Sequence, residues 1–563
     1  MRRLLLFCLL SLSLSVHAQS FFTPQKYPPN SFRNPLDFPI SLVGNFGECR
    51  PNHFHSGIDI RTNGKENQAV HAIDDGFVSR IKIEENGFGT ALYITHLNGY
   101  TSLYAHLNSY FPELEKYVRQ KQYETKSWKQ DLYFPPHQFP IRKGKLIAWS
   151  GNTGSSQGPH LHLEIRNTKT ENPLNPLLFF ASLPDTKAPI LKQIAVYDGN
   201  KSIYEQRPLL LPITKGKLTK ETIVIPSSKA FLGFVGDDFM EAASGTLGIY
   251  QMNLFVNDQA YFAWQMDDIS YDITRYMNAL ADFKSKKNGG PWIQLCHRLP
   301  NDKLPVYKSM NAQDGMLDLS DGTPKKITIE VLDTRNNKSA VTFFLQGNTN
   351  ENASSCAHLL QAAKKNVYED AYMNFTLAED DLYDDICFSS SAKPSTQTYS
   401  YLYQVHRPDV PIHHYFDLIL KPKISIPIEL NDKLAVVRQA NSGESRSKGK
   451  AGKLVNGNVM VSIREFGNYE IVVDQKPPNI SSSIKDRQVI TSLKRLTFTA
   501  VDEITSVLKY NATVDGKWLR IAQQGNTFYY TLDEHFPLGT HTFTFSATDE
   551  NENTKTITYQ LTR

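Results

Sequence analysis

Two distant segments of this chain repeat one pattern of turns and short strands. The stretch "DTKAPILKQIAVYD", which begins at Asp185, is echoed by "DQKPPNISSSI", which begins at Asp474. Further along, "FLGFVGDDF" is echoed by "FTAVDEITS", and "VLDTRNN" by "ATDENEN". Such a repeat indicates one structural unit used twice. Short alternating runs separated by turn residues are typical of immunoglobulin-like sandwiches, which we expect over residues 185–348 and 474–563.

Each copy closes on a turn led by an aspartate, Asp333 or Asp549, before its last strand. Aspartates at these places could bind calcium, but capping of the turn is the interpretation that we favour. Modules of this kind more often act as spacers or binding units than as catalysts. The chemistry of the chain is therefore expected elsewhere.

A chain of 563 residues is too long for one core, and the repeat leaves two further regions to place. Residues 19–180 are expected to form one domain, dense in glycine, histidine and short strand patterns over 36–178, and residues 355–473 are predicted to form a β-rich module of unknown type. With 40% hydrophobic and 21% charged residues the chain has the composition of a folded protein. Its net charge of +4 gives no reason to expect a nucleic-acid partner.

The first residues, "MRRLLLFCLLSLSLSVHAQS", are typical of a cleavable secretory signal over residues 1–18. We therefore expect an exported protein, most simply periplasmic, with full secretion as the alternative. No later segment is apolar for long enough to cross a membrane as a helix. Four cysteines remain after the signal, Cys49, Cys296, Cys356 and Cys387, and their pairing is left open, free thiols included.

The stretch "PHLHLEIR" places two histidines one residue apart in an apolar alternation. Because side chains alternate between the faces of a strand, His160, His162 and Glu164 point one way and the aliphatic residues point to a core. A divalent metal is one partner that two such imidazoles can share. Alone, the pattern would more simply mean two surface histidines.

A second motif, "HFHSGIDIRT", places His55 and Asp59 four residues apart. In extended backbone these two also share a face. Together with one of the later histidines they would supply two imidazoles and a carboxylate, the ligand set of a catalytic zinc whose fourth position is left for water.

A third element, "ALYITHLNGYTSLYAHL", predicts a β-hairpin around the Asn-Gly turn at 98–99. The simplest register sets Tyr93 opposite Tyr104 and places His106 on their face, with His96 on the other. This favours His106 over His96 as a residue of the site.

These motifs, "HFHSGIDI", "GYTSLYAHL" and "GNTGSSQGPHLHLEIR", follow "GNFGECR" in this order over about residues 40–178. In this the chain resembles the LytM and lysostaphin-type zinc endopeptidases, which cut the peptides of peptidoglycan. The resemblance implies an antiparallel β catalytic domain. The fold expected for the whole is mainly β, a catalytic domain with a helical insertion followed by immunoglobulin-like and other β-rich modules.

By this resemblance the metal ligands are His55, Asp59 and His162, holding one Zn²⁺. The two histidines of the family that are not ligands correspond to His106 and His160, which are the expected catalytic residues. Which of the two is the base stays open. The substrate implied is the stem peptide of peptidoglycan.

Four more residues lie near these motifs. His53 and His71 stand at no expected position and are interpreted as structural or surface residues, whereas Asn45 and Arg50 precede the first ligand motif and are expected to line the cleft.

The link between His106 and the next motif is longer than the family's usual turn. Within residues 109–140, "PELEKYVRQKQYETKSW" predicts a helix beginning at Pro112. This insertion could form a wall of the substrate groove or pack on the surface.

Three rival functions remain open: a zinc-holding activator of another wall hydrolase, a secreted lytic enzyme against foreign walls, and an adhesin with a vestigial peptidase domain. The modules after residue 185 would then bind protein or wall partners.

Overall fold

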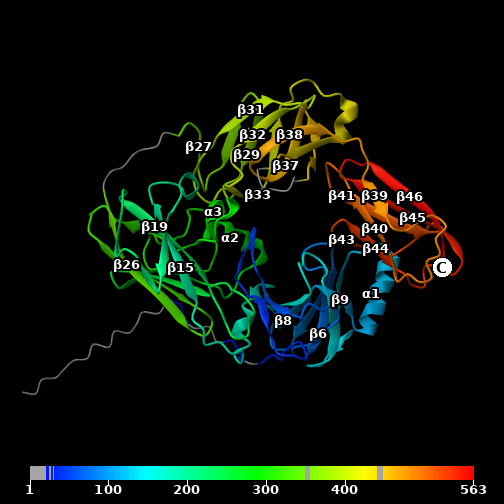
Figure 1. Cartoon of the computed structure of the whole chain (residues 1–563), viewed down its shortest axis with the longest axis horizontal. Coiled ribbons are helices and arrows are strands. Elements are labelled where there is room, and N and C mark those ends of the chain that lie inside the picture. The colour runs from blue at the N-terminus through cyan, green and yellow to red at the C-terminus, as the bar shows by residue number, and fades with distance from the viewer. Residues whose placement is uncertain (1–20, 24–26, 30, 349–355, 441–447) are drawn as a thin grey trace, which may run out of the picture.

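The computed structural model describes residues 21–23, 27–29, 31–348, 356–440 and 448–563. The predicted signal over residues 1–18 lies outside the described residues. The chain is mostly β, as the sequence predicts, and its parts follow one another around a ring, so that the last lies beside the first (Figure 1). We refer to the N-terminal domain (31–180), the first module (185–348), the middle module (356–473) and the last module (474–563).

Over the described ranges, no helix has both the length and the apolar character needed to cross a bilayer.

The N-terminal domain is built on one large antiparallel sheet that carries both predicted ligand motifs on adjacent strands. Its strand order is β1-β4-β13-β8-β7-β6-β10, and a smaller sheet, β5-β12-β9, completes the domain. The bounds are β1 (Leu42–Gly44), β4 (Ile58–Arg61), β5 (Ala69–His71), β6 (Gly76–Ile83), β7 (Thr90–His96), β8 (Tyr100–Ala105), β9 (Leu107–Tyr110), α1 (Pro112–Thr125), β10 (Gln130–Tyr133), β12 (Leu146–Ser150) and β13 (His160–Asn167). The short strands β2 (Cys49–Arg50), β3 (His53–Phe54), β11 (Pro140–Ile141) and β14 (Pro173–Leu174) flank them.

Strand β13 forms as its alternation predicts. Leu161, Leu163 and Ile165 are fully buried in the domain core, which turns the alternating residues His160 and His162 to the other face.

The predicted register of the β7–β8 hairpin is wrong by one residue. Tyr93 pairs with Leu103 and not with Tyr104, because the loop contains Leu97 as well as the predicted turn. Gly99, with a φ of 87°, provides the left-handed residue that closes a three-residue hairpin loop. Tyr104 therefore lies on the face opposite Tyr93.

The first module consists of two sheets, β17-β16-β15-β19-β22 with β24 at its edge, and β18-β26-β25-β20-β21-β23. The strands are β15 (Ile190–Asp198), β16 (Leu209–Thr214), β17 (Lys217–Leu218), β18 (Thr222–Ile225), β19 (Lys229–Asp237), β20 (Gln251–Val256), β21 (Gln259–Gln265), β22 (Gln294–Leu295), β23 (Tyr307–Ser309), β24 (Leu317–Asp318), β25 (Lys325–Leu332) and β26 (Lys338–Gly347). Between β21 and β22 lie the 3₁₀ helix η3 (Tyr271–Tyr276) and the helices α2 (Met277–Leu280) and α3 (Phe283–Lys287).

The middle module also has two main sheets, β28-β29-β33-β37-β36 and β31-β32-β38-β34-β35. Its strands are β27 (Leu359–Leu360), β28 (Asn366–Glu369), β29 (Met373–Leu377), β30 (Ile386–Cys387), β31 (Ser390–Pro394), β32 (Tyr401–Val405), β33 (Pro411–Leu420), β34 (Leu434–Arg438), β35 (Lys450–Ala451), β36 (Lys453–Val455), β37 (Asn458–Glu465) and β38 (Gly467–Val473). A disulfide joins Cys356 to Cys387, whereas Cys49 and Cys296 are free thiols, so one pairing and the free-thiol alternative both occur.

The last module pairs the sheets β39-β40-β44-β43 and β42-β41-β45-β46. Its strands are β39 (Asn479–Ser482), β40 (Arg495–Val501), β41 (Val507–Val514), β42 (Lys517–Trp518), β43 (Ala522–Gln524), β44 (Thr527–Thr531), β45 (Thr540–Asp549) and β46 (Thr554–Thr562). It has a hydrophobic core of its own.

Helix α1 begins at Pro112, as predicted, but it contacts the last module. The Tyr123 hydroxyl donates to Asp533 over 2.9 Å, and its ring stacks on His535 with centroids 3.5 Å apart. Arg520 donates to Gln122 over 3.1 Å. This contact closes the ring in Figure 1.

Candidate metal centre

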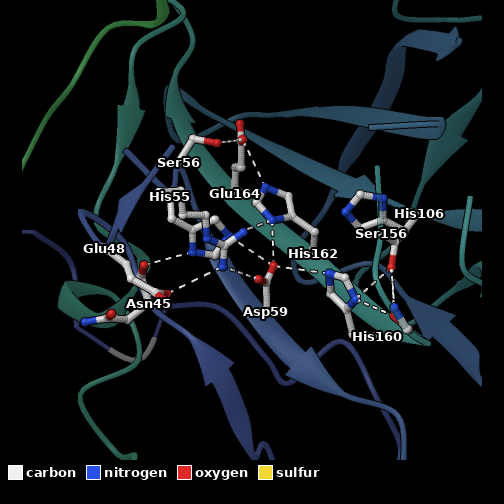
Figure 2. Close-up of polar contacts among 12 residues, drawn as sticks. Asn45, Glu48, His55, Ser56, Asp59, His106, Ser156, His160, His162 and Glu164 are labelled. Carbon is white, nitrogen blue, oxygen red and sulfur yellow. Dashed lines mark hydrogen bonds and ion pairs between the residues drawn. The ribbon is translucent and has the colours of Figure 1, made fainter. Parts of the chain in front are cut away.

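Three predicted ligands converge between β4 and β13. The two strands are antiparallel, with Asp59 paired opposite His162, and His55 lies just before β4. Asp59 Oδ1 is 3.0 Å from His55 Nε2 and 2.8 Å from His162 Nδ1, and these two nitrogens are 3.0 Å apart (Figure 2). All three side chains are buried. The structure thus brings together the residues that separate motifs supplied.

Two imidazole nitrogens and one carboxylate oxygen that face a common point suit a zinc ion that keeps one position open. The second nitrogen or oxygen of each group is held elsewhere, so the atoms facing that point are left for a metal. The donor set therefore fits zinc.

Each of the three ligands is oriented by one partner. His55 Nδ1 donates to the carbonyl of Asn45 over 2.8 Å, and Asp59 Oδ2 accepts from Arg50 Nη2 at 2.6 Å. Of the two residues expected to line the cleft, Arg50 does so, whereas the Asn45 side chain bonds to Gly248 of the first module.

His162 is oriented by a carboxylate behind it. Its Nε2 donates to Glu164 Oε1 over 3.1 Å, and Glu164 is fully buried. Glu164 also accepts from Arg166 Nε over 2.7 Å and from Ser56 Oγ over 2.5 Å. A carboxylate behind a ligating histidine fixes the ring and raises its basicity.

Tyr271, at the start of η3 in the first module, completes this network. Its hydroxyl donates to Glu164 Oε1 and lies 2.9 Å from Ser56 Oγ. The first module therefore reaches the layer of residues directly behind the metal ligands. The sequence motifs gave no role to Glu164 and did not indicate Tyr271.

The charges of the site shift its pKa values in opposite directions. Burial lowers the pKa of His55 to about 4. Burial opposes a charge on His162 too, but hydrogen bonds with Asp59 and Glu164 raise its pKa to about 9. Burial alone would raise the pKa of Asp59, yet the surrounding histidines hold it well below its usual value. Without a metal the site thus holds an imidazolium between two carboxylates.

The two predicted catalytic histidines stand beside this centre. The ring centroids of His106 and His160 are 4.7 Å apart, and those of His106 and His162 are 5.9 Å apart. His106 follows β8 with a φ of 59°, a left-handed conformation that turns its ring out of the strand pattern. His106 therefore lies near the site because of this backbone conformation, and not because of the predicted hairpin register.

Hydrogen bonds fix the tautomers of these two histidines. Nδ1 of His106 donates to the carbonyl of Thr153, and Nδ1 of His160 to that of Gly158, both over 2.8 Å. Nε2 then carries the lone pair in each neutral ring. Burial, with His162 and His160 nearby, lowers the pKa of His106 to about 3, so this ring is neutral at ordinary pH.

The other histidines of the domain have structural partners. His96 is buried against the Asp75 carbonyl and the Ser102 hydroxyl, and His71 bonds to Asp37. His53 is exposed at the rim of the cleft, where its ring bonds to the Pro51 carbonyl.

The centre opens into a cleft of about 960 Å³. Phe88, Ser156 and Tyr271 line it together with the four histidines and the aspartate of the site. Among the described residues that line it, none comes from the insertion at 109–140. The insertion is therefore not a wall of this cleft, and it serves as the contact with the last module.

Comparison with known proteins agrees with the motifs. Residues 53–138 match Peptidase family M23, and residues 357–474 match a Zu5-like domain. The chain is 33% identical over 122 residues to the DD-carboxypeptidase/endopeptidase Mpg of Neisseria meningitidis, which covers 22% of each protein. It is 31% identical over 153 residues to the murein hydrolase activator NlpD of Salmonella dublin, covering 27% of this chain and 33% of that protein.

The search of solved structures finds the catalytic domain of lysostaphin from Staphylococcus simulans. The match has 19% identity and a TM-score of 0.19, and covers 24% of this chain and 90% of that one. The chain spans about a fifth to a third of the length of the curated relatives it matches.

Proposed function

We propose, from the M23 peptidase domain that this chain contains, that the protein is a zinc-dependent endopeptidase that hydrolyses peptide cross-links of peptidoglycan. The observation that carries the proposal is the convergence of His55, Asp59 and His162 in one cleft with two further histidines. An activator that only holds a metal would not need the second pair.

The residues divide the chemistry between them. Zinc bound by His55, Asp59 and His162 would acidify a water molecule and polarise the peptide carbonyl. When the rings of His160 and His106 are neutral, the lone pair of each lies on Nε2, so either can accept a proton from the water and return it to the leaving nitrogen. Either histidine can serve as the base in this scheme.

The location and partners follow from the substrate. A peptidoglycan hydrolase acts outside the cytoplasm, which agrees with the predicted signal at 1–18. The stem peptides of peptidoglycan would occupy the cleft, and the three β modules would contact other wall or protein components.

Digestion of purified cross-linked peptidoglycan fragments by the zinc-loaded full chain tests this function. Mass spectrometry should show cross-linked dimers becoming monomers, and a chelator should abolish the reaction. His160→Ala should remove activity with all three ligands intact. His71→Ala, a histidine outside the cleft, serves as the matched control and should cut like the wild type. Activity should also fall in acid, since protons compete with the metal.

The relative named as a murein hydrolase activator supports one alternative. In that case the zinc-loaded chain would cut no fragment by itself but would stimulate a second wall hydrolase, and His160→Ala would stimulate equally well. The same assay with an added hydrolase separates the two functions.

A further inference from the structure

Three aspartates converge where the first module begins. Asp185 precedes β15, Asp238 directly follows β19, and Asp333 follows β25. Each offers a carboxylate oxygen within 4.8 Å of the others. Asp238 is 3% exposed and Asp333 1% exposed. None of them belongs to the metal centre described above.

The last module repeats this cluster. Asp474, Asp502 and Asp549 also lie within 4.8 Å of one another and are all buried. The two clusters occupy the same three positions of the internal repeat. Asp185 and Asp474 open the modules, and Asp238 and Asp502 directly follow the strands β19 and β40. Asp333 and Asp549 lead the closing turns. A pair of equivalent clusters in two diverged copies is hard to explain by the capping of one turn.

Capping accounts for one aspartate of the first cluster and two of the last. Asp333 Oδ1 accepts from the amides of Arg335 and Asn337, over 2.7 and 3.0 Å. Asp549 Oδ1 accepts likewise from Asn551 and Asn553, over 2.8 and 2.9 Å, and Asp502 Oδ1 from Ile504 and Thr505, over 2.8 and 2.7 Å. The favoured interpretation of the closing turns is thus correct, but it leaves Asp238 of the first cluster unexplained.

The buried Asp238 carboxylate lacks a partner for Oδ1. This atom has no hydrogen-bond partner among the described residues, although it is shielded from solvent. Arg335 brings positive charge near the cluster, but its guanidinium donates to the carbonyls of Leu177 and Phe180. A buried anionic oxygen without a donor is costly unless a cation compensates it.

We propose that each cluster binds a calcium ion. All donors are carboxylate oxygens, the hard ligands that Ca²⁺ prefers, and waters or backbone carbonyls would complete its six to eight positions. The absence of nitrogen and sulfur donors separates these clusters from the His-Asp-His centre, which suits zinc.

The clusters stand at two junctions of the ring. In the first, Asn337 Nδ2 donates to Asp333 and to the Asp185 carbonyl, at the exit from the N-terminal domain. In the last, Asn553 Nδ2 donates to Asp549 and to the Asp474 carbonyl, at the exit from the middle module. A cation at either place would bind the segment that enters the module together with the ends of two of its strands. It would therefore fix the angle between that module and the part of the chain before it.

The raised pKa values of the clusters agree with the proposal. Burial, with the neighbouring carboxylates, raises the pKa of Asp238 to about 8 and that of Asp185 and Asp474 to about 6. Charged together, these groups repel one another, and Ca²⁺ would reverse that penalty.

Calcium titration of the zinc-loaded full chain tests the proposal, with calorimetry for stoichiometry and thermal unfolding for linkage. We expect two ions per chain and a rise in Tm of at least about 3 °C at saturating Ca²⁺. Asp238→Asn and Asp502→Asn should each lose one ion, and the double variant both. Asp321→Asn, which alters an exposed turn aspartate, should bind like the wild type.

A variant that merely misfolds is distinguished in calcium-free buffer. There Asp238→Asn should be about as stable as the wild type, because the Asp238 carboxyl is largely neutral below its pKa of about 8 and Asn has the same shape, and only the gain from Ca²⁺ should be lost. The proposal is overturned if the wild type shows no saturable binding up to about 1 mM Ca²⁺, the weak limit of extracellular calcium modules, or if both aspartate variants bind two ions. Neither readout depends on peptide hydrolysis.

Discussion

The N-terminal domain touches two β modules, one on each side, and the two contacts are built differently. Against the first module it buries Phe46 and Phe54 in a shared hydrophobic core, and it receives Tyr271 at Glu164 behind the metal ligands. Against the last module it offers the surface of α1, where Tyr123 stacks on His535.

The difference lies in what each contact supports. The first contact joins two cores and ends at groups that orient a metal ligand, so the metal centre is incomplete without it. The last contact consists of side-chain bonds at the rim between two separate cores. One point of it lies near the site: Gln524 Nε2 donates to the carbonyl of Asn152, next to the residue that holds His106. The first module is thus part of the metal centre, whereas the last module closes the ring.

Phe54→Ala should give the largest effect, because it breaks the shared core of the first contact. The side chain is 2% exposed, and removal of a buried phenylalanine costs about 3–5 kcal/mol of stability. Chemical denaturation measures this loss. Tyr123→Ala, an aromatic truncation at the other contact, is the control, and equal losses for the two would contradict the comparison.

The pH dependence of zinc binding comes next in size. Because the pKa of His162 is raised to about 9, metal must displace its Nδ1 proton at neutral pH. Zinc affinity should therefore rise roughly tenfold per pH unit from about 7 to 9 and then level off. The stability of the metal-free protein changes with pH in the opposite direction. The raised pKa of His162 stabilises the fold below about pH 6.5, and this contribution is lost as the pH rises through about 9.

Competition with a zinc-sensitive dye across this range measures the first effect. Glu164→Gln removes one of the charges that raise this pKa, so its affinity profile should level off at lower pH. If Glu164→Gln left the pH profile of zinc affinity unchanged, Glu164 would not be raising the pKa of His162. Tyr271 could then not act on this ligand through the charge of Glu164.

Parts of this site were predictable because they are local. The two-residue period of β13 places His160 and His162 on one face whatever surrounds the strand, and the spacing of His55 and Asp59 works in the same way. His106 lies beside the site although the predicted hairpin register was wrong. The family resemblance indicated this residue, and its own left-handed backbone conformation turns its ring toward the site.

Other parts depend on how distant segments meet. Tyr271 follows Glu164 by 107 residues and belongs to another module, and no pattern around it differs from an ordinary turn. Likewise, the helical character of residues 112–125 was clear, but its role could not be read from the sequence. That role depends on ring closure, which brings residues more than 400 positions apart into contact.

Tyr271→Phe should show a smaller effect on the site itself. It removes only the hydroxyl that holds Glu164, and loss of such a supporting group costs about 10-fold in metal affinity or activity. Zinc affinity and the ratio of kcat to KM should be measured together, because a group that only stabilised the fold would leave zinc affinity unchanged. Tyr123→Phe makes the same change at the last contact and should leave both quantities at the wild-type level.

Opening the ring should have the smallest effect on stability and activity. The combined change Tyr123→Ala and Gln524→Ala removes a stack, the hydrogen bond of Tyr123 to Asp533 and one hydrogen bond to a carbonyl, all partly exposed, and we expect a loss of about 1 kcal/mol. Small-angle scattering should nevertheless show a larger radius of gyration, since the contacts of Arg520 with Gln122 and of Glu534 with Arg119 would be left to hold the last module against α1. If cleavage of cross-linked fragments instead fell as far as in Tyr271→Phe, the bond at Asn152 would be positioning His106, and the last module would belong to the catalytic unit as much as the first.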